Sequence, residues 1–115
     1  MNNRSSAASE TNAFDNEANF LSAMGNAKRL HILRLLAQGE LSVTVLADEV
    51  GLSQSSTSQH LSILREQELV RTRRAAQTIY YSLHSGAVRT MLDTLADIFG
   101  THRHANAEYI RAVGT

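Results

Sequence analysis

Residues 43–68 read VTVLADEVGLSQSSTSQHLSILREQE and contain the two helices on which the fold depends. Apolar residues recur at helical spacing over 43–50, which predicts a short amphipathic helix there. Gly51 suits the left-handed residue that ends a helix, and Ser53 suits the N-cap of a second helix, predicted over 53–68. Two helices joined by so tight a turn form a helix-turn-helix, whose second helix enters the major groove of DNA.

The outward face of the second helix carries short, uncharged polar side chains. If Thr57, Leu61 and Leu64 point inward, Ser and Gln residues occupy the opposite stripe. A solvated helix face usually carries Lys and Glu, whereas Gln and Ser reach base edges, and Gln pairs well with N6 and N7 of adenine. The predicted base-reading residues are Gln54, Ser55, Ser58 and Gln59. A Ser-rich surface of a domain that does not bind DNA is the alternative interpretation.

A change of period after Leu69 predicts a β-hairpin. Apolar residues alternate over 78–83, which indicates a strand, and 70–73 is its predicted partner across a loop at 74–77. Arginines in such a hairpin would lie along a phosphate backbone or in a minor groove, although charges also protect an edge strand from aggregation. The predicted backbone and wing contacts are Ser56, His60, Arg65, Arg71, Arg73, Arg74 and Gln77.

The charge distribution supports this placement, although the net charge of the chain is zero. Residues 53–83 carry four Arg and two Glu, so the middle third of the chain is basic. Lys28 and Arg29 are expected to flank the site. His60 lies beside the inward stripe, so a partly buried, hydrogen-bonded histidine is as good an interpretation as a DNA contact.

Helical spacing predicts three further helices, at about 14–24, 27–37 and 86–99. The last repeats apolar residues more widely than a helix needs to cover one side of a small core, which indicates a helix partner. The fold class is therefore mainly α with a small β-hairpin (α+β), a winged helix-turn-helix. The predicted domain spans 14–100, and flexible tails are expected at 1–13 and 101–115.

Composition excludes several classes of function. The chain has 115 residues and no Cys, which removes disulfides, thiolate metal sites and cysteine nucleophiles. It has no Gly-rich nucleotide loop, no paired-carboxylate motif and no nucleophile with an evident base, so we expect neither an enzyme nor a cofactor. No apolar stretch is long enough for a signal peptide or a membrane span, so the protein is expected in the cytoplasm.

Several of these segments together resemble the ArsR/SmtB family of bacterial winged-helix repressors, and within it the nodulation repressors. The segments are Met24 to Leu33, Leu41 to Leu69 with its Ser58-Gln59-His60-Leu61 motif, and Thr78 to Leu83. The resemblance covers about residues 14–100 and implies a homodimer joined through the first and last helices. The implied interface residues are Phe14, Ala18, Leu21, Val88, Met91, Leu92, Leu95 and Phe99.

The sequence departs from the family where many of its members bind metal. The positions similar to a pair of cysteine ligands hold Ser42 and Thr44, whose hydroxyls are poor ligands for soft or borderline cations. A second family site would match Ser85, Ala87, Ile98 and Thr101, none of which is a ligand. His102 and His104 have no third ligand, so we expect no metal.

The leading hypothesis is therefore a homodimeric repressor on double-stranded DNA. Its two recognition helices would read half-sites about 34–36 Å apart in a pseudo-palindromic operator. Because no Arg stands among the base readers, the half-sites should contain A·T pairs. The alternatives are a repressor gated by a small molecule that is not a metal, and a winged helix that binds a protein partner.

Overall fold

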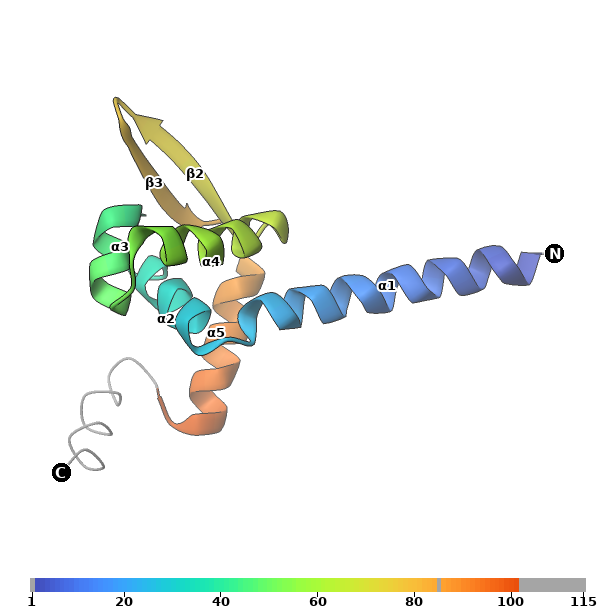
Figure 1. The fold of residues 1–115 in the computed structure, drawn as a ribbon. Coiled ribbons are helices and arrows are strands. Elements are labelled where there is room, and N and C mark those ends of the chain that lie inside the picture. Colours follow the sequence, from blue (N-terminus) through green and yellow to red (C-terminus); the bar gives the residue numbers. More distant parts are fainter. Residues whose placement is uncertain (1, 85, 102–115) are drawn as a thin grey trace. The chain divides into compact units, whose positions relative to one another are not determined.

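The computed structural model describes residues 2–84 and 86–101 (Figure 1). Over these residues the elements are, in chain order, α1 (Asn2–Met24), α2 (Ala27–Leu36), β1 (Leu41–Ser42), α3 (Val43–Val50), α4 (Gln54–Glu66), β2 (Val70–Ala75), β3 (Thr78–Leu83) and α5 (Gly86–Phe99). The elements from α1 to β3 form one compact unit, and α5 belongs to a second. The predicted helix-turn-helix and the hairpin that follows it are both present, as α3, α4 and the β2–β3 pair.

The helix-turn-helix is defined by its caps. Ser42 Oγ accepts a hydrogen bond from the Val45 N–H at 3.3 Å, and Ser53 Oγ accepts one from the Ser56 N–H at 3.0 Å. Each bond satisfies a backbone donor that has no partner within its helix. Between the helices Gly51 has φ 70°, the left-handed conformation predicted for the end of α3. The sequence therefore placed both helix starts and the turn correctly.

The core of the first unit forms where α2 meets α3 and α4. The predicted inward stripe of α4 is confirmed, because Thr57, Leu61 and Leu64 are each 0% exposed. The Thr57 hydroxyl donates to the carbonyl oxygen of Ser53 at 2.8 Å, so burial leaves this polar group satisfied. The apolar core residues of this unit are Ala23, Met24, Ile32, Leu33, Leu36, Leu46, Ala47, Val50, Leu61, Leu64, Leu69 and Val70.

The sheet has three antiparallel strands in the order β1-β3-β2, one more strand than predicted. β1 is only two residues long, too short to show a period, and Leu41 pairs with Tyr81 at the edge of β3 that β2 leaves open. β3 has its predicted bounds, whereas β2 is two residues longer than predicted, since Ala75 pairs with Thr78 across a two-residue turn. Ala76 in that turn has φ 56°, without the Asn-Gly sequence that usually marks such turns.

The first helix begins at Asn2, twelve residues before the predicted start at about 14. Residues 2–13 were predicted to be a tail because they lack an apolar period. They also contain neither Gly nor Pro, so nothing in them breaks a helix once the following turns have formed. At its other end α1 contacts α2 and α4, and Ala23 and Met24 are buried there.

The second unit contributes the amphipathic helix α5, whose bounds match the prediction. Its buried residues, Val88, Leu92 and Ala96, are spaced four apart and share one face. Ile98 and Phe99 are 66% and 65% exposed. Among the helices of the described residues, none is long and apolar enough to cross a membrane.

The end of α4 generates a stability prediction. Glu68 follows the C-cap residue with φ 59°, a left-handed conformation that costs a residue with a Cβ about 1–2 kcal/mol. Glu68→Gly should therefore raise the free energy of unfolding by about 0.5–1 kcal/mol, after the greater entropy of Gly in the unfolded chain is subtracted. Urea denaturation measures this change.

Glu66→Gly is the matched control, because Glu66 is the last residue of the same helix and is also exposed. It should lower the free energy of unfolding by about 0.5–1 kcal/mol. Equal destabilisation by the two substitutions would show that the conformation of Glu68 carries no strain.

Candidate nucleic-acid interface

The outward face of α4 is the centre of the candidate interface. Gln54, Ser55, Ser58 and Gln59 are all exposed, and Ser56 is half-buried at the first turn. Ser55, Ser58 and Gln59 lie opposite the inward stripe because the helical period fixes which positions share a face, and Gln54 is exposed as the first residue of α4. The structure thus brings the predicted base readers together on one surface, while their contact with DNA stays a prediction.

One of these residues is held by a neighbour that the sequence analysis missed. The Nε2 amide group of Gln54 donates a hydrogen bond to the hydroxyl of Thr44 in the first turn of α3, at 3.2 Å. Both side chains are exposed. The sequence analysis treated Thr44 only as a poor ligand at the position of a family metal site, and nothing in the local spacing of the sequence indicates its contact with Gln54.

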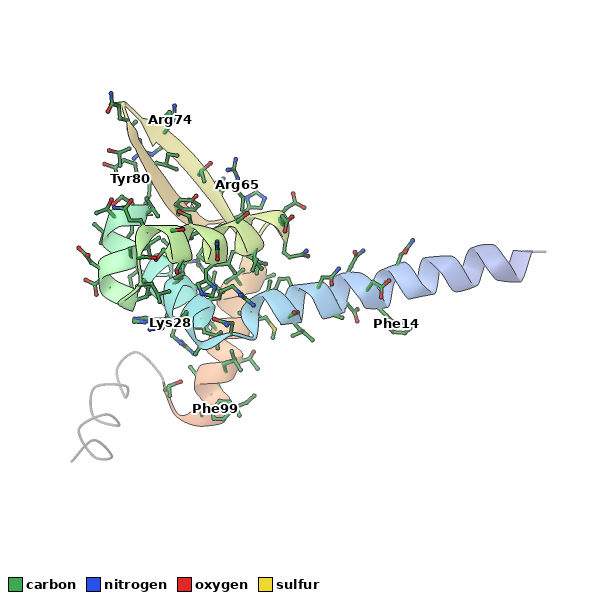
Figure 2. All side chains as sticks on the ribbon, in the orientation of Figure 1. Phe14, Lys28, Arg65, Arg74, Tyr80 and Phe99 are labelled. Carbon is green, nitrogen blue, oxygen red and sulfur yellow. The ribbon has the colours of Figure 1, made fainter. Side chains whose placement is uncertain are left out.

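The arginines that are predicted to contact the DNA backbone lie on two kinds of element. Arg74 lies near the far end of the β2–β3 hairpin, and Arg65 lies on α4, as Figure 2 shows. Arg71, Arg74 and Gln77 are exposed as well. Neither Arg65 nor Arg74 makes a hydrogen bond or ion pair within residues 2–84 and 86–101, so their guanidinium groups are available to phosphates.

Arg73, predicted as a wing contact, is exposed and forms an ion pair within the chain. Its Nη2 lies 2.8 Å from Glu40 Oε1 and its Nε donates to Glu40 Oε2 at 3.1 Å. Its guanidinium carbon lies 4.8 Å from the centre of the Tyr80 ring. The hydrogen bond from Arg73 holds the pKa of the Glu40 carboxyl below its ordinary value, and the charges of Arg73 and Arg71 lower it further. Arg73 therefore ties the hairpin to the segment before β1.

Lys28 and Arg29, expected to flank the site, cap helices instead. Lys28 Nζ donates to the Val50 carbonyl oxygen at 2.7 Å, at the end of α3. Arg29 donates from Nε to the Ala23 carbonyl oxygen at 2.6 Å and from Nη2 to that of Ser22 at 3.2 Å, at the end of α1. Cations are favourable at these carbonyl-rich helix ends.

His60 is half-buried and hydrogen-bonded, as one of its two interpretations predicted. Its Nδ1 lies 3.2 Å from Nη1 of Arg29. Because a guanidinium has only donors, Nδ1 must be the accepting nitrogen of a neutral ring. Burial lowers the pKa of the imidazole, and the charges of Arg29 and Lys28 lower it further. The ring joins α4 to α2 and, through Arg29, to the end of α1.

The side chains at the positions of the family's metal ligands do not fit a metal. Ser42 caps α3 and Thr44 accepts from Gln54, so both hydroxyls are already engaged. Of the second set, Ala87, Ile98 and Thr101 offer no ligand that zinc favours. Ser85, His102 and His104 lie outside the described residues, within which no three His, Cys, Asp or Glu side chains gather.

The predicted interface residues fall into two groups. Phe14, Ala18, Leu21 and Phe99 are exposed, and Met91 and Leu95 are half-buried. Phe14 is 67% and Leu21 55% exposed, which is unusual for side chains of this size. Val88 and Leu92, at 0% and 4% exposed, are already buried within one chain, and their place in a dimer interface stays a prediction.

Comparison with known proteins gives consistent similarities. The sequence profile described as "Bacterial regulatory protein, arsR family" matches residues 26–72. Nodulation protein NolR of Rhizobium meliloti is 58% identical over 91 residues, which are 79% of this chain and 75% of NolR. The crystal structure of NolR from Sinorhizobium fredii has a TM-score of 0.76 and 53% identity, over 80% of this chain and 92% of that chain.

A further solved structure carries a description of its assembly. It is the homodimeric winged helix-turn-helix DNA-binding domain of Mb0332 from Mycobacterium bovis, a possible ArsR-family transcriptional regulator. Its TM-score is 0.73 at 30% identity, and the match covers 82% of this chain and 87% of that chain. Both solved structures thus share the arrangement described above over most of their length.

The lowered pKa of His60 predicts how stability depends on pH. The unfolded chain binds a proton on this residue near its ordinary pKa of 6.5, whereas the folded chain does so only at lower pH. The stabilisation from a neutral His60 is therefore complete above about pH 6.5 and is lost as the pH falls toward the pKa of the folded state. Urea denaturation at several pH values between 5 and 8 measures this loss.

His60→Gln should flatten that pH dependence, because an amide does not titrate. The unsubstituted chain, measured over the same pH range, is the reference. An NMR titration that gave His60 a pKa at or above its ordinary value of 6.5 would contradict the prediction.

Proposed function

The chain belongs to the arsR family of bacterial regulatory proteins, and we propose that it represses transcription as a homodimer bound to a pseudo-palindromic DNA operator. Family membership agrees with the resemblance that the motifs indicated. The observation that carries the proposal is the outward face of α4, an exposed stripe of uncharged hydrogen-bonding side chains close in sequence to unpaired arginines. We propose no catalytic activity and place the protein with its operator in the cytoplasm.

Base recognition is assigned to Gln54, Ser55, Ser58 and Gln59 on α4. A Gln amide donates to N7 and accepts from the N6 amino group of adenine, which makes A·T pairs the natural partners of Gln54 and Gln59. No Arg is exposed on this stripe to make the bidentate contact with guanine. The half-sites are therefore expected to contain A·T pairs.

Contacts with the DNA backbone are assigned to residues whose side chains make no hydrogen bond or ion pair within residues 2–84 and 86–101. These are Arg65, Arg71, Arg74 and Gln77, with Ser56 at the first turn of α4. Phosphate contacts fix the position of a protein on the duplex and carry no sequence information. Arg73 is left out of this set because its guanidinium is paired with Glu40.

Dimerisation is assigned to apolar residues of α1 and α5 that are exposed or half-buried. They are Phe14, Ala18 and Leu21 on α1, and Met91, Leu95 and Phe99 on α5. Exposed aromatic side chains of this size favour association, because each buries a large apolar area in an interface. A two-fold dimer would present its two α4 helices to successive major grooves, about 34–36 Å apart, and would block access of RNA polymerase.

No metal is required for this binding, in keeping with the engaged hydroxyls of Ser42 and Thr44. Duplex selection from a randomised pool at physiological salt, with zinc and again with a chelator, tests this. An inverted repeat containing A·T pairs should be enriched equally under both conditions. Without enrichment or salt-dependent duplex binding, a protein partner for the winged helix would replace DNA as the ligand.

Substitutions in the two sets of DNA contacts should behave differently. Gln54→Ala and Gln59→Ala should each relax preference at one base pair, with a loss of about 1–3 kcal/mol in discrimination. Arg74→Ala should instead weaken binding to all sequences and reduce the salt slope by about 1. Affinities measured on the selected duplex and its variants, at several salt concentrations, distinguish the two effects.

Arg73→Ala provides the matched control on the same strand. Because Arg73 is paired with Glu40, its replacement should change the salt slope less than Arg74→Ala does. A larger change for Arg73→Ala would show that the ion pair opens on DNA and that Arg73 belongs to the wing contacts.

The assembly has its own test in sedimentation equilibrium. Phe14→Glu places a charge in the proposed interface and should shift the protein toward monomer, with loss of operator affinity. Ile63→Glu is the matched control, since Ile63 is an exposed apolar residue of α4 outside the proposed interface. An unchanged dimer in Phe14→Glu would exclude α1 from the interface.

A further inference from the structure

A hydrogen bond between the two helices of the helix-turn-helix assigns a role to a residue outside the recognition helix. We propose that Thr44 is a positioning residue, which holds the side-chain amide of Gln54 in place while one donor and one acceptor of the amide stay available to an adenine. This inference rests on the proposed function, because it concerns how one of the proposed base readers achieves its selectivity. It names a specificity-determining residue on α3.

The two side chains lie close together because the first turns of α3 and α4 are both held in place. Thr44 is the second residue of α3, and Gln54 is the first residue of α4. The cap bonds of Ser42 and Ser53 hold these first turns, and the buried faces of α3 and α4 pack in one core. With both backbones fixed, the Gln54 amide meets the Thr44 hydroxyl at 3.2 Å.

The contact holds the amide in place and leaves both kinds of hydrogen-bonding group available. A Gln side chain ends in a carbonyl oxygen and an NH₂ group of nearly the same shape, and a hydroxyl can pair with either because it both donates and accepts. In the structure Nε2 donates to Thr44 and so uses one of its two N–H groups. One N–H and the carbonyl oxygen Oε1 stay available, side by side. That pair matches N7 and the N6 amino group of adenine.

The contact also reduces the cost of ordering Gln54 on DNA. A long, exposed side chain loses rotamer freedom when it enters an interface, and a contact that already limits this freedom lowers the loss. Thr44 is suited to this role because its β-branched side chain has few χ1 rotamers and its hydroxyl accepts hydrogen bonds. A threonine in the first turn of α3 thus provides a stiff support for a flexible reader.

Thr44 is exposed, so the packing of the fold does not depend on it. The interface between α3 and α4 is built by buried residues such as Leu46, Val50 and Leu61. The loss of the hydroxyl should therefore leave the folded structure intact while it frees the Gln54 amide. A positioning role and a structural role are separable in this way.

The test measures affinities of the full chain for its selected duplex and for variants changed at one base pair. Gln54→Ala identifies the pair that Gln54 reads, as the position where preference is relaxed. Thr44→Val removes the hydroxyl with little change in shape and should reduce preference at that same pair about three- to tenfold, the effect of one hydrogen bond. Preference at other pairs and the thermal unfolding midpoint should stay unchanged.

Two further variants complete the experiment. Thr44→Ser keeps the hydroxyl and should restore the preference. The double substitution of Thr44→Val with Gln54→Ala should lose no more discrimination than Gln54→Ala alone, because the hydroxyl acts only through the amide. If Thr44→Val fails to fold, Thr44→Ala removes the same hydroxyl and gives the same comparison.

The outcomes separate this inference from the proposed function. If Gln54→Ala relaxes one base pair and Thr44→Val does not, the positioning role is wrong and the proposed function stands. If Thr44→Val weakens all duplexes equally, Thr44 contacts the DNA backbone and the inference is also wrong. If Gln54→Ala leaves every preference unchanged, Gln54 is not a base reader, and both the assignment and the inference fail.

Discussion

Burial of one stripe of α4 is the constraint on which the rest of the site depends. Thr57, Leu61 and Leu64 are fully buried, and they fix the rotation of the helix about its own axis. A helix with one face held in the core has its opposite face determined as well, because successive residues advance by a constant angle. The polar stripe of Ser55, Ser58 and Gln59 therefore faces outward for the same reason that Leu61 faces inward. The helical period of α4 therefore determines both which residues pack in the core and which residues face outward for the proposed base recognition.

The use of positive charge is the second organising feature. Lys28 and Arg29 are basic residues whose charged groups cap the carbonyl ends of α3 and α1, and Arg73 is paired with Glu40. A count of charges along the chain cannot separate such residues from the unpaired Arg65 and Arg74. Neither the zero net charge of the chain nor the excess of Arg in residues 53–83 shows which charged side chains are paired. Within residues 2–84 and 86–101, the guanidinium groups of Arg65 and Arg74 make no hydrogen bond or ion pair, and their positions mark the part of the candidate interface that is proposed to contact phosphates.

Local patterns predicted most of the helix-turn-helix and its outward residues. The Ser53 cap, the left-handed Gly51 and the end points of α3 and α5 followed from signals within a few residues. The start of α1 was missed, because a helix without an apolar period gives no signal over residues 2–13. β1 was missed because a two-residue strand exists only through its pairing with β3. Neither miss affects the face of α4.

The sequence by itself determined which residues share a helix face and where α3, α4 and α5 begin, since backbone periodicity and capping act over one or two turns. The tertiary structure alone decided which of those residues are engaged. Arg73 and Glu40 are 33 positions apart, Arg29 and His60 are 31 apart, and Thr44 and Gln54 are 10 apart. Each pair meets only because buried side chains elsewhere fix the relative placement of two elements. Such contacts depend on the packing of the whole unit, which no local stretch of sequence encodes.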